Sequence, residues 1–174
     1  MQSSVPHYPW YAVVSGKDVE QGDILQGCPV YTPESVSHDG EAMLRRTRRD
    51  VIIMTHSCDM QRVKPPAVLF CDVIQRSAIP PDHKLSKSDS LEMARKGQVP
   101  AFHVLAECEY DGYRREISVV DFRQVLSLPF DFVKREAEHR LHLRLLPPYR
   151  EHLSQAFARF FMRVGLPSDI PSIR

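Results

Sequence analysis

The sequence has no long hydrophobic run, few glycines and almost no net charge. No apolar stretch approaches the roughly 18 residues that a membrane-spanning helix needs, so no membrane-embedded role is expected. The 7 glycines form neither a phosphate-cradling loop nor a dinucleotide fingerprint, which excludes kinase, NTPase and Rossmann functions from the expectation. With a net charge of +1, any nucleic-acid role must depend on a local cluster of basic residues.

Cysteine is also sparse, and none of the four cysteines forms a CxxC pair. Residues 1–10 have neither a charged region nor an apolar region of the kind found in secretion signals, so we expect a cytoplasmic protein with free thiols. Cys28, Cys71 and Cys108 lie in apolar strand contexts and are predicted to be core thiols. The sequence identifies no cofactor.

The composition is that of one globular domain built from short elements, with 43% hydrophobic residues and 14 prolines. We expect a single domain over 1–174, with an N-terminal arm at 1–10 and a mainly β region at 11–146. A loop and helix insertion is expected at about 77–98, and a C-terminal helix at 148–165. The strand predictions rest on apolar runs, on alternation and on the hairpin signal Asp111-Gly112, and they include 51–54, 67–74, 102–109, 113–120 and 140–146.

Two segments have the pattern of helices. In the first, Asp89 or Ser90 can cap the start, and Gly97 stands where a left-handed C-cap belongs. The second begins at Pro148, ends at 165–167 and carries an aromatic face that is expected to pack on the core, with docking of a partner protein as the alternative. The sequence thus predicts an α+β fold: a small barrel-like antiparallel sheet, a short middle helix and a long C-terminal amphipathic helix.

The segment VIIMTHSCDM, Val51 to Met60, ends a predicted core strand in hydroxyl, imidazole, thiol and carboxylate groups. If the strand persists, His56 and Cys58 share a face, and Asp59 could orient the imidazole for nucleophilic catalysis by the thiol. His103 on the predicted hairpin is an equally good base, because catalytic partners are usually distant in sequence. The alternatives are a metal site that adds distant Cys or His ligands to His56 and Cys58, and a plain core cysteine.

Histidines 142 and 152 lie on polar-looking faces and are expected to be solvated.

The segment RRTRR contains Arg45, Arg46, Arg48 and Arg49, four arginines in five positions. Arginine forks suit phosphate, so these residues are the predicted nucleic-acid patch, placed in a turn beside the polar strand end. Few aromatic residues interleave with them, which argues against a platform for stacking bases. A solvated turn that keeps the protein soluble is the alternative.

The segments QGDILQGCPV, RRDVIIMTHSCD and AVLFCDVI together resemble the opening of MazF/PemK-type toxins over about residues 21–74. The resemblance implies an SH3-like barrel and, as in many members, cleavage of single-stranded RNA. Arg49-Asp50 stands where that family has Arg-Pro, and neither Cys58-Asp59 nor the C-terminal helix has a counterpart there. The chain is also similar to uncharacterised bacterial proteins with an S-C-D strand end.

The sequence therefore predicts a bacterial binding module that engages RNA, DNA or a partner protein through the polar strand end and the basic turn. The alternative is a Cys58-dependent enzyme, either a thiol hydrolase or a metal-assisted one, including a ribonuclease. Whether the protein is an enzyme stays open at this point, no resident metal site is predicted, and no membrane partner is expected.

Overall fold

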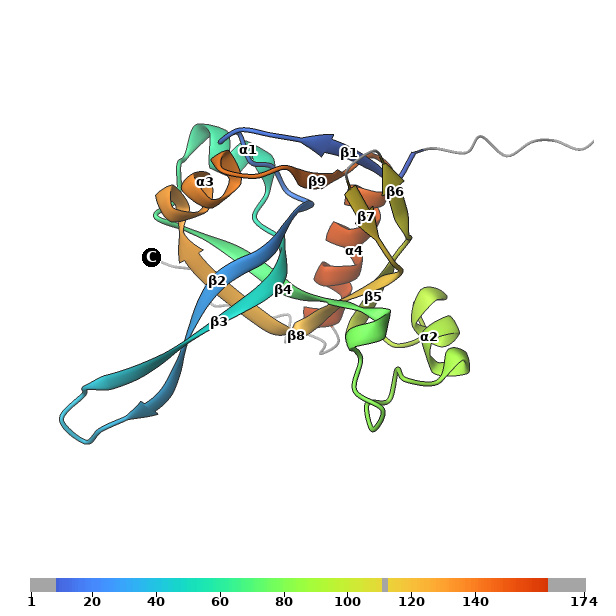
Figure 1. The fold of residues 1–174 in the computed structure, drawn as a ribbon, viewed down its shortest axis with the longest axis horizontal. Helices are drawn as coiled ribbons and strands as arrows, with labels where there is room; N and C mark the ends of the chain where they lie inside the picture. Colours follow the sequence, from blue (N-terminus) through green and yellow to red (C-terminus); the bar gives the residue numbers. More distant parts are fainter. Residues whose placement is uncertain (1–8, 111–112, 163–174) are drawn as a thin grey trace, which may run out of the picture.

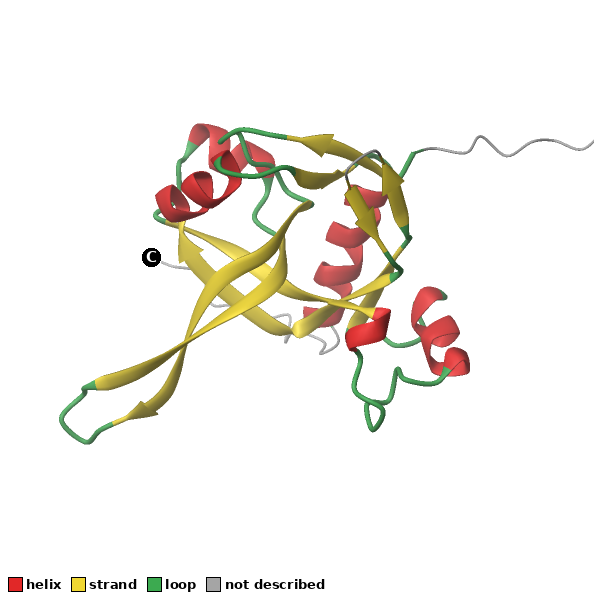
Figure 2. Ribbon diagram, viewed as in Figure 1, coloured by secondary structure: helices red, strands yellow, loops and turns green. Residues whose placement is uncertain are grey.

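The computed structural model describes residues 9–110 and 113–162 (Figure 1). The strands in these residues are β1 (Tyr11–Val14), β2 (Asp23–Val36), β3 (Ala42–Ile53), β4 (Ala67–Gln75), β5 (Phe102–Leu105), β6 (Cys108–Tyr110), β7 (Tyr113–Arg115), β8 (Ser118–Pro129) and β9 (His142–Leu145). The helices are α1 (Ser57–Arg62), α2 (Ser88–Arg95), α3 (Phe130–Glu138) and α4 (Tyr149–Phe161), with a 3-10 turn at Arg76–Ala78 (Figure 2). Most of the predicted N-terminal arm and the predicted helix stop at 165–167 lie outside the described residues.

The main sheet is antiparallel, with the strand order β1-β9-β2-β3-β4-β8-β5, while β6 and β7 form a separate pair. The end strands β1 and β5 do not pair with each other, so the sheet is open and the predicted SH3-like barrel is wrong. The pairing of β3 shows where the sheet departs from a barrel. This strand pairs with β2 from Ala42 to Ile52 but with β4 only from Val51 to Ile53, so β2 and β3 leave the sheet together as a projecting ribbon.

Two helices cover hydrophobic clusters built on the sheet. Leu153 of α4 is fully buried in a cluster with Phe122 and Leu143, and the Phe157 ring lies 5.4 Å from the Phe122 ring. The apolar side of α3 packs in a second cluster with residues of β3 and β4. The expectation that the aromatic face of the C-terminal helix packs on the core is therefore confirmed, and Phe161 at its end stays exposed.

Several local expectations are confirmed with changed boundaries. The hairpin signal Asp111-Gly112 lies outside the described residues, but β6 and β7 pair on either side of it. Each predicted hairpin strand is split in two, and β5 pairs with β8. Gly97 has the positive φ of 73° expected after the middle helix, although the N-cap is Lys87.

The sequence did not predict α3. No helix in the described part of the chain has the length and the apolar character needed to cross a membrane.

Candidate functional site

The polar segment after β3 forms a helix cap rather than a longer strand. His56 is the N-cap of α1, and its Nδ1 accepts a hydrogen bond from the backbone N–H of Cys58 at 3.3 Å. Thr55 Oγ1 accepts from a backbone N–H of β4 at 2.7 Å, and Ser57 Oγ accepts from the N–H of Gln21 at 3.0 Å. A core strand ends in these polar residues because their side chains bond backbone groups at the turn. The predicted strand face shared by His56 and Cys58 is therefore wrong.

His56 and the exposed Cys58 still come together, because both line a cavity of about 340 Å³. The opposite wall of this cavity belongs to α4 and includes Arg150 and Glu151. Asp59 is exposed and is not part of the lining, so of the predicted Cys58, His56 and Asp59 arrangement only Cys58 and His56 share this cavity.

The fourth candidate, His103, lies on β5 and lines a different cavity beside Trp10. Burial, together with the charge of His152, lowers the pKa of His103 to about 4, so its imidazole is neutral at pH 7. The structure therefore does not place His103 beside Cys58, and the two residues do not share a site.

A buried polar network was missed by the sequence analysis. Asp23 and His142 are fully buried, with His142 Nε2 3.2 Å from Asp23 Oδ2. Arg144 donates hydrogen bonds to both carboxylate oxygens of Asp23, at 2.7 and 2.9 Å. The Glu20 carboxylate accepts one hydrogen bond from Arg144 at 2.7 Å and one from Arg150 at 3.2 Å. The expectation of a solvated His142 is wrong, because β9 lies inside the sheet between β1 and β2.

The network sets the charge state of its buried acid. Burial on its own would raise the pKa of Asp23, but hydrogen bonds from Arg144 and His142 outweigh it and hold the pKa below its ordinary value. The signal in the sequence was the alternation of His and Arg with leucine in RLHLRLL. That alternation indicates a strand with one buried face, whereas both faces of β9 are covered.

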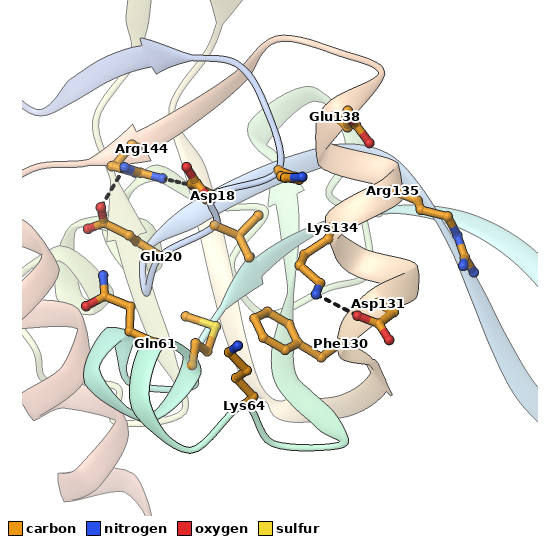
Figure 3. A pocket seen from close by; sticks show the side chains of 13 residues that line it. Asp18, Glu20, Gln61, Lys64, Phe130, Asp131, Lys134, Arg135, Glu138 and Arg144 are labelled. Carbon is orange, nitrogen blue, oxygen red and sulfur yellow. Dashed lines mark hydrogen bonds and ion pairs between the residues drawn. The ribbon is translucent and has the colours of Figure 1, made fainter.

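A larger cavity, with a volume of about 880 Å³, lies between the β1–β2 loop, α1 and α3 (Figure 3). Its apolar wall is formed by Val19, Met60 and Phe130. The charged lining residues are Lys17, Asp18, Glu20, Lys64, Asp131, Lys134, Arg135, Glu138 and Arg144, which amounts to five cations and four carboxylates. A polyanion would meet carboxylates from both the β1–β2 loop and α3, so the charge pattern of this cleft does not suit nucleic acid.

The described residues contain no group of three or more His, Cys, Asp or Glu side chains arranged to hold a metal ion. The prediction of core thiols is confirmed, since Cys28, Cys71 and Cys108 are buried. Burial raises the pKa of the Cys28 thiol to about 11 and that of Cys71 to about 12, so both are protonated at neutral pH.

The four arginines of the predicted patch lie in β3 rather than in a turn. They belong to the arm, which we define as residues 29–48, the ribbon of β2 and β3 that projects from the sheet (Figure 1), together with Arg49 at its base. Strand β3 rises about 3.3 Å per residue, so Arg46 is roughly 23 Å from the end of the strand at Ile53. The basic residues and the polar segment at His56 therefore do not form one site, contrary to the prediction.

The register of the arm divides its arginines between two faces. Arg46 pairs with Tyr31, Arg48 with Pro29 and Leu44 with Pro33, and these residues share one face, which we call the cationic face. The alternation of the strand puts Arg45 and Arg49 on the other face, which we call the neutralised face.

The two faces differ in whether their arginines form ion pairs with carboxylates. On the neutralised face, Arg45 forms an ion pair with Glu34, and Arg49 Nη1 lies 2.8 Å from Asp72 Oδ2. On the cationic face, both arginines are exposed and neither forms an ion pair within the described residues. Arg48 donates one hydrogen bond to the carbonyl of Gly27 at 3.0 Å.

The cationic face also carries an aromatic side chain that the sequence analysis missed. Tyr31 is 46% exposed directly across from Arg46, and Leu44 beside them is 59% exposed. Tyr31 is 15 residues from Arg46 in the chain, so only the hairpin register brings the ring to the guanidinium. Few aromatic residues were expected among the arginines, and the register brings one of them, Tyr31, beside Arg46 on this face.

No model of a known protein family matches this chain, and no curated protein matches it either. The resemblance to MazF/PemK-type toxins therefore stays a prediction, and function has to be inferred from geometry and charge.

Proposed function

We propose that the protein binds single-stranded nucleic acid through the cationic face of the arm. The observation that carries this proposal is the register of the arm, which sets an exposed tyrosine beside two exposed arginines that pair with no carboxylate in the described part of the chain. On this face β3 carries no carboxylate between Ala42 and Arg48, and the β2 residues opposite are Val36, Pro33, Tyr31 and Pro29.

Each group on the cationic face has a counterpart in a single strand. The guanidinium groups of Arg46 and Arg48 can bind phosphates, and the Tyr31 ring can stack on a base. In a duplex the bases are stacked on one another, so an exposed ring gains its contact only with an unpaired base. We therefore expect single strands to bind more tightly than a duplex of the same length.

The charge on the rest of the arm limits where the strand can lie. The hairpin turn at 37–41 carries Asp39 and Glu41, which would repel phosphates at the tip. The Glu34 and Asp72 carboxylates cancel the charge of the arginines on the neutralised face. Binding is therefore expected along the middle of the cationic face.

The two faces provide a matched pair of variants for the test. Arg46→Gln with Arg48→Gln and Arg45→Gln with Arg49→Gln each remove two positive charges from the same strand. Fluorescence anisotropy with labelled single-stranded RNA and DNA at low salt should show a loss of about tenfold or more for the first pair and a much smaller loss for the second. Equal losses, or no binding by the unmodified protein, would overturn the proposal, and circular dichroism would check that both variants are folded.

A thiol-dependent hydrolase is the second candidate, because Cys58 and His56 line the same cavity. Because His56 Nδ1 accepts the hydrogen bond from the Cys58 N–H, the proton of the neutral imidazole lies on Nε2, so the ring can take the thiol proton only through Nδ1, after this hydrogen bond is released. Incubating the protein and its Cys58→Ser variant with labelled RNA and with a chromogenic ester tests this candidate. Turnover that disappears in the variant would support it, and equal rates would eliminate it.

A further inference from the structure

The cavity that His103 lines has a volume of about 430 Å³ and lies away from the arm, and four of its ten lining residues carry rings. Its ring side chains are Trp10, His103, Tyr149 and His152, which come from the segment before β1, from β5 and from α4. Trp10 and Tyr149 stack nearly parallel, with their centroids 3.7 Å apart. This volume is typical of sites for small organic molecules, and flat walls of this kind favour a flat occupant.

His103 is a polar group of this cavity to which no described residue forms a hydrogen bond. Its ring lies on Phe122, with the centroids 6.3 Å apart, and neither ring nitrogen forms a hydrogen bond within the described residues. Because the imidazole is neutral at pH 7, it offers one N–H donor and one bare nitrogen acceptor. His103 is partly buried, and a ligand that supplies one acceptor and one donor can form hydrogen bonds with both of its ring nitrogens.

The charged groups at the cavity decide what charge the ligand can carry. Arg95 donates two hydrogen bonds, each of 2.7 Å, to the Glu92 carboxylate, so its charge is compensated. Glu107 forms no ion pair within the described residues. The balance around the cavity therefore disfavours an anionic ligand and accepts a neutral or cationic one.

We propose that this cavity is a binding site for a planar heteroaromatic molecule without negative charge, packed against the ring side chains and hydrogen-bonded to His103. The site uses none of the residues of the arm, so ligand binding in this cavity can be tested independently of nucleic-acid binding. Benzimidazole is a suitable probe because it is flat, is mainly neutral at pH 7.5 and carries one N–H donor beside one nitrogen acceptor. Benzoate has a similar size but a negative charge, and serves as the matched negative probe.

Trp10 is the only tryptophan of the chain, so its fluorescence reports directly on this cavity. Titration of the full chain with benzimidazole should change the Trp10 emission saturably, whereas benzoate should not. His103→Phe keeps a ring but removes both nitrogens and should weaken binding at least tenfold, while His103→Asn, which keeps a donor and an acceptor, should retain part of the affinity. His139→Ala, at an exposed histidine outside the cavity, is the control and should bind as the unmodified protein does.

No saturable change up to the solubility limit of benzimidazole would overturn the proposal. So would equal binding by the unmodified protein and a folded His103→Phe variant, or equal binding of benzoate. If His103→Phe fails to fold, the comparison of benzimidazole with benzoate on the unmodified protein and on His103→Asn decides the matter.

Discussion

Arg144 and Arg46 show what the same side chain does in two settings of one molecule. All three side-chain nitrogens of Arg144 donate hydrogen bonds, to Asp23, to Glu20 and to the carbonyl of Asp18. Arg46 is exposed on the arm and forms no ion pair within the described residues. Arginine thus stabilises the fold where carboxylates surround it and is available to a ligand where none is near. Counting arginines in the sequence does not separate the two roles.

Removing Arg144 should have the largest effect on stability. Arg144→Ala leaves the fully buried Asp23 carboxylate without its main partner, and a broken buried pair of this kind costs about 3–5 kcal/mol of unfolding free energy. Arg46→Ala should change the unfolding free energy by less than about 0.5 kcal/mol. Urea denaturation of both variants measures the difference, and similar losses would contradict the distinction between the two arginines.

The stability of the protein should depend on pH through Asp23, the buried acid of the same network. The pKa of Asp23 is lower in the folded protein than its ordinary value of 3.8, so the folded state favours the ionised form. This stabilisation is fully present above pH 3.8 and is lost as the pH falls through the folded pKa. The difference in unfolding free energy between the protein and Asp23→Asn should therefore shrink below that pH. A difference that stays constant in urea titrations from pH 7 to pH 3 would show that Asp23 is not held in this way.

The next largest effect, on single-strand affinity, is expected from substitution of Tyr31 on the arm. Tyr31→Ala should weaken single-strand binding by roughly fivefold or more, because stacking on an aromatic ring contributes about 1–3 kcal/mol per base. Tyr31→Phe keeps the ring and should bind nearly as the unmodified protein does. Anisotropy titrations compare the three proteins, and loss of binding in Tyr31→Phe would assign the contact to the hydroxyl group instead of the ring.

The smallest effect should come from turning a neutralised arginine into a free one. Glu34→Gln removes the carboxylate that pairs with Arg45, an exposed ion pair that contributes little to stability. The freed charge should raise single-strand affinity about two- to threefold at low salt, with the gain disappearing at high salt. An unchanged affinity at low salt would mean that the neutralised face is too far from the bound strand.

Features set by neighbouring residues could be predicted from the sequence. The apolar runs at 51–54 and 67–74 predicted buried strands, and the pattern that ends in Gly97 predicted α2. Both predictions were possible because strand and helix periods depend on the spacing of neighbouring residues. The burial of Cys28 and Cys71 followed from the same apolar contexts.

Features set by distant pairing could not be predicted in this way. Whether a curved sheet closes depends on contacts between its two end strands, which no local pattern contains. The burial of His142 depends on β9 lying between β1 and β2, and the meeting of Tyr31 with Arg46 depends on the hairpin register. Trp10 and His103 line one cavity although 93 residues separate them in the sequence.

The salt dependence of single-strand binding by the two double arginine variants tests the central claim most directly. Each phosphate contact on a single strand contributes about 0.7 to the slope of log affinity against log salt, so two contacts contribute about 1.4. We expect Arg46→Gln with Arg48→Gln to lower the slope by about that amount and Arg45→Gln with Arg49→Gln to leave it nearly unchanged. Equal changes in slope for the two variants would contradict the assignment of binding to one face of the arm.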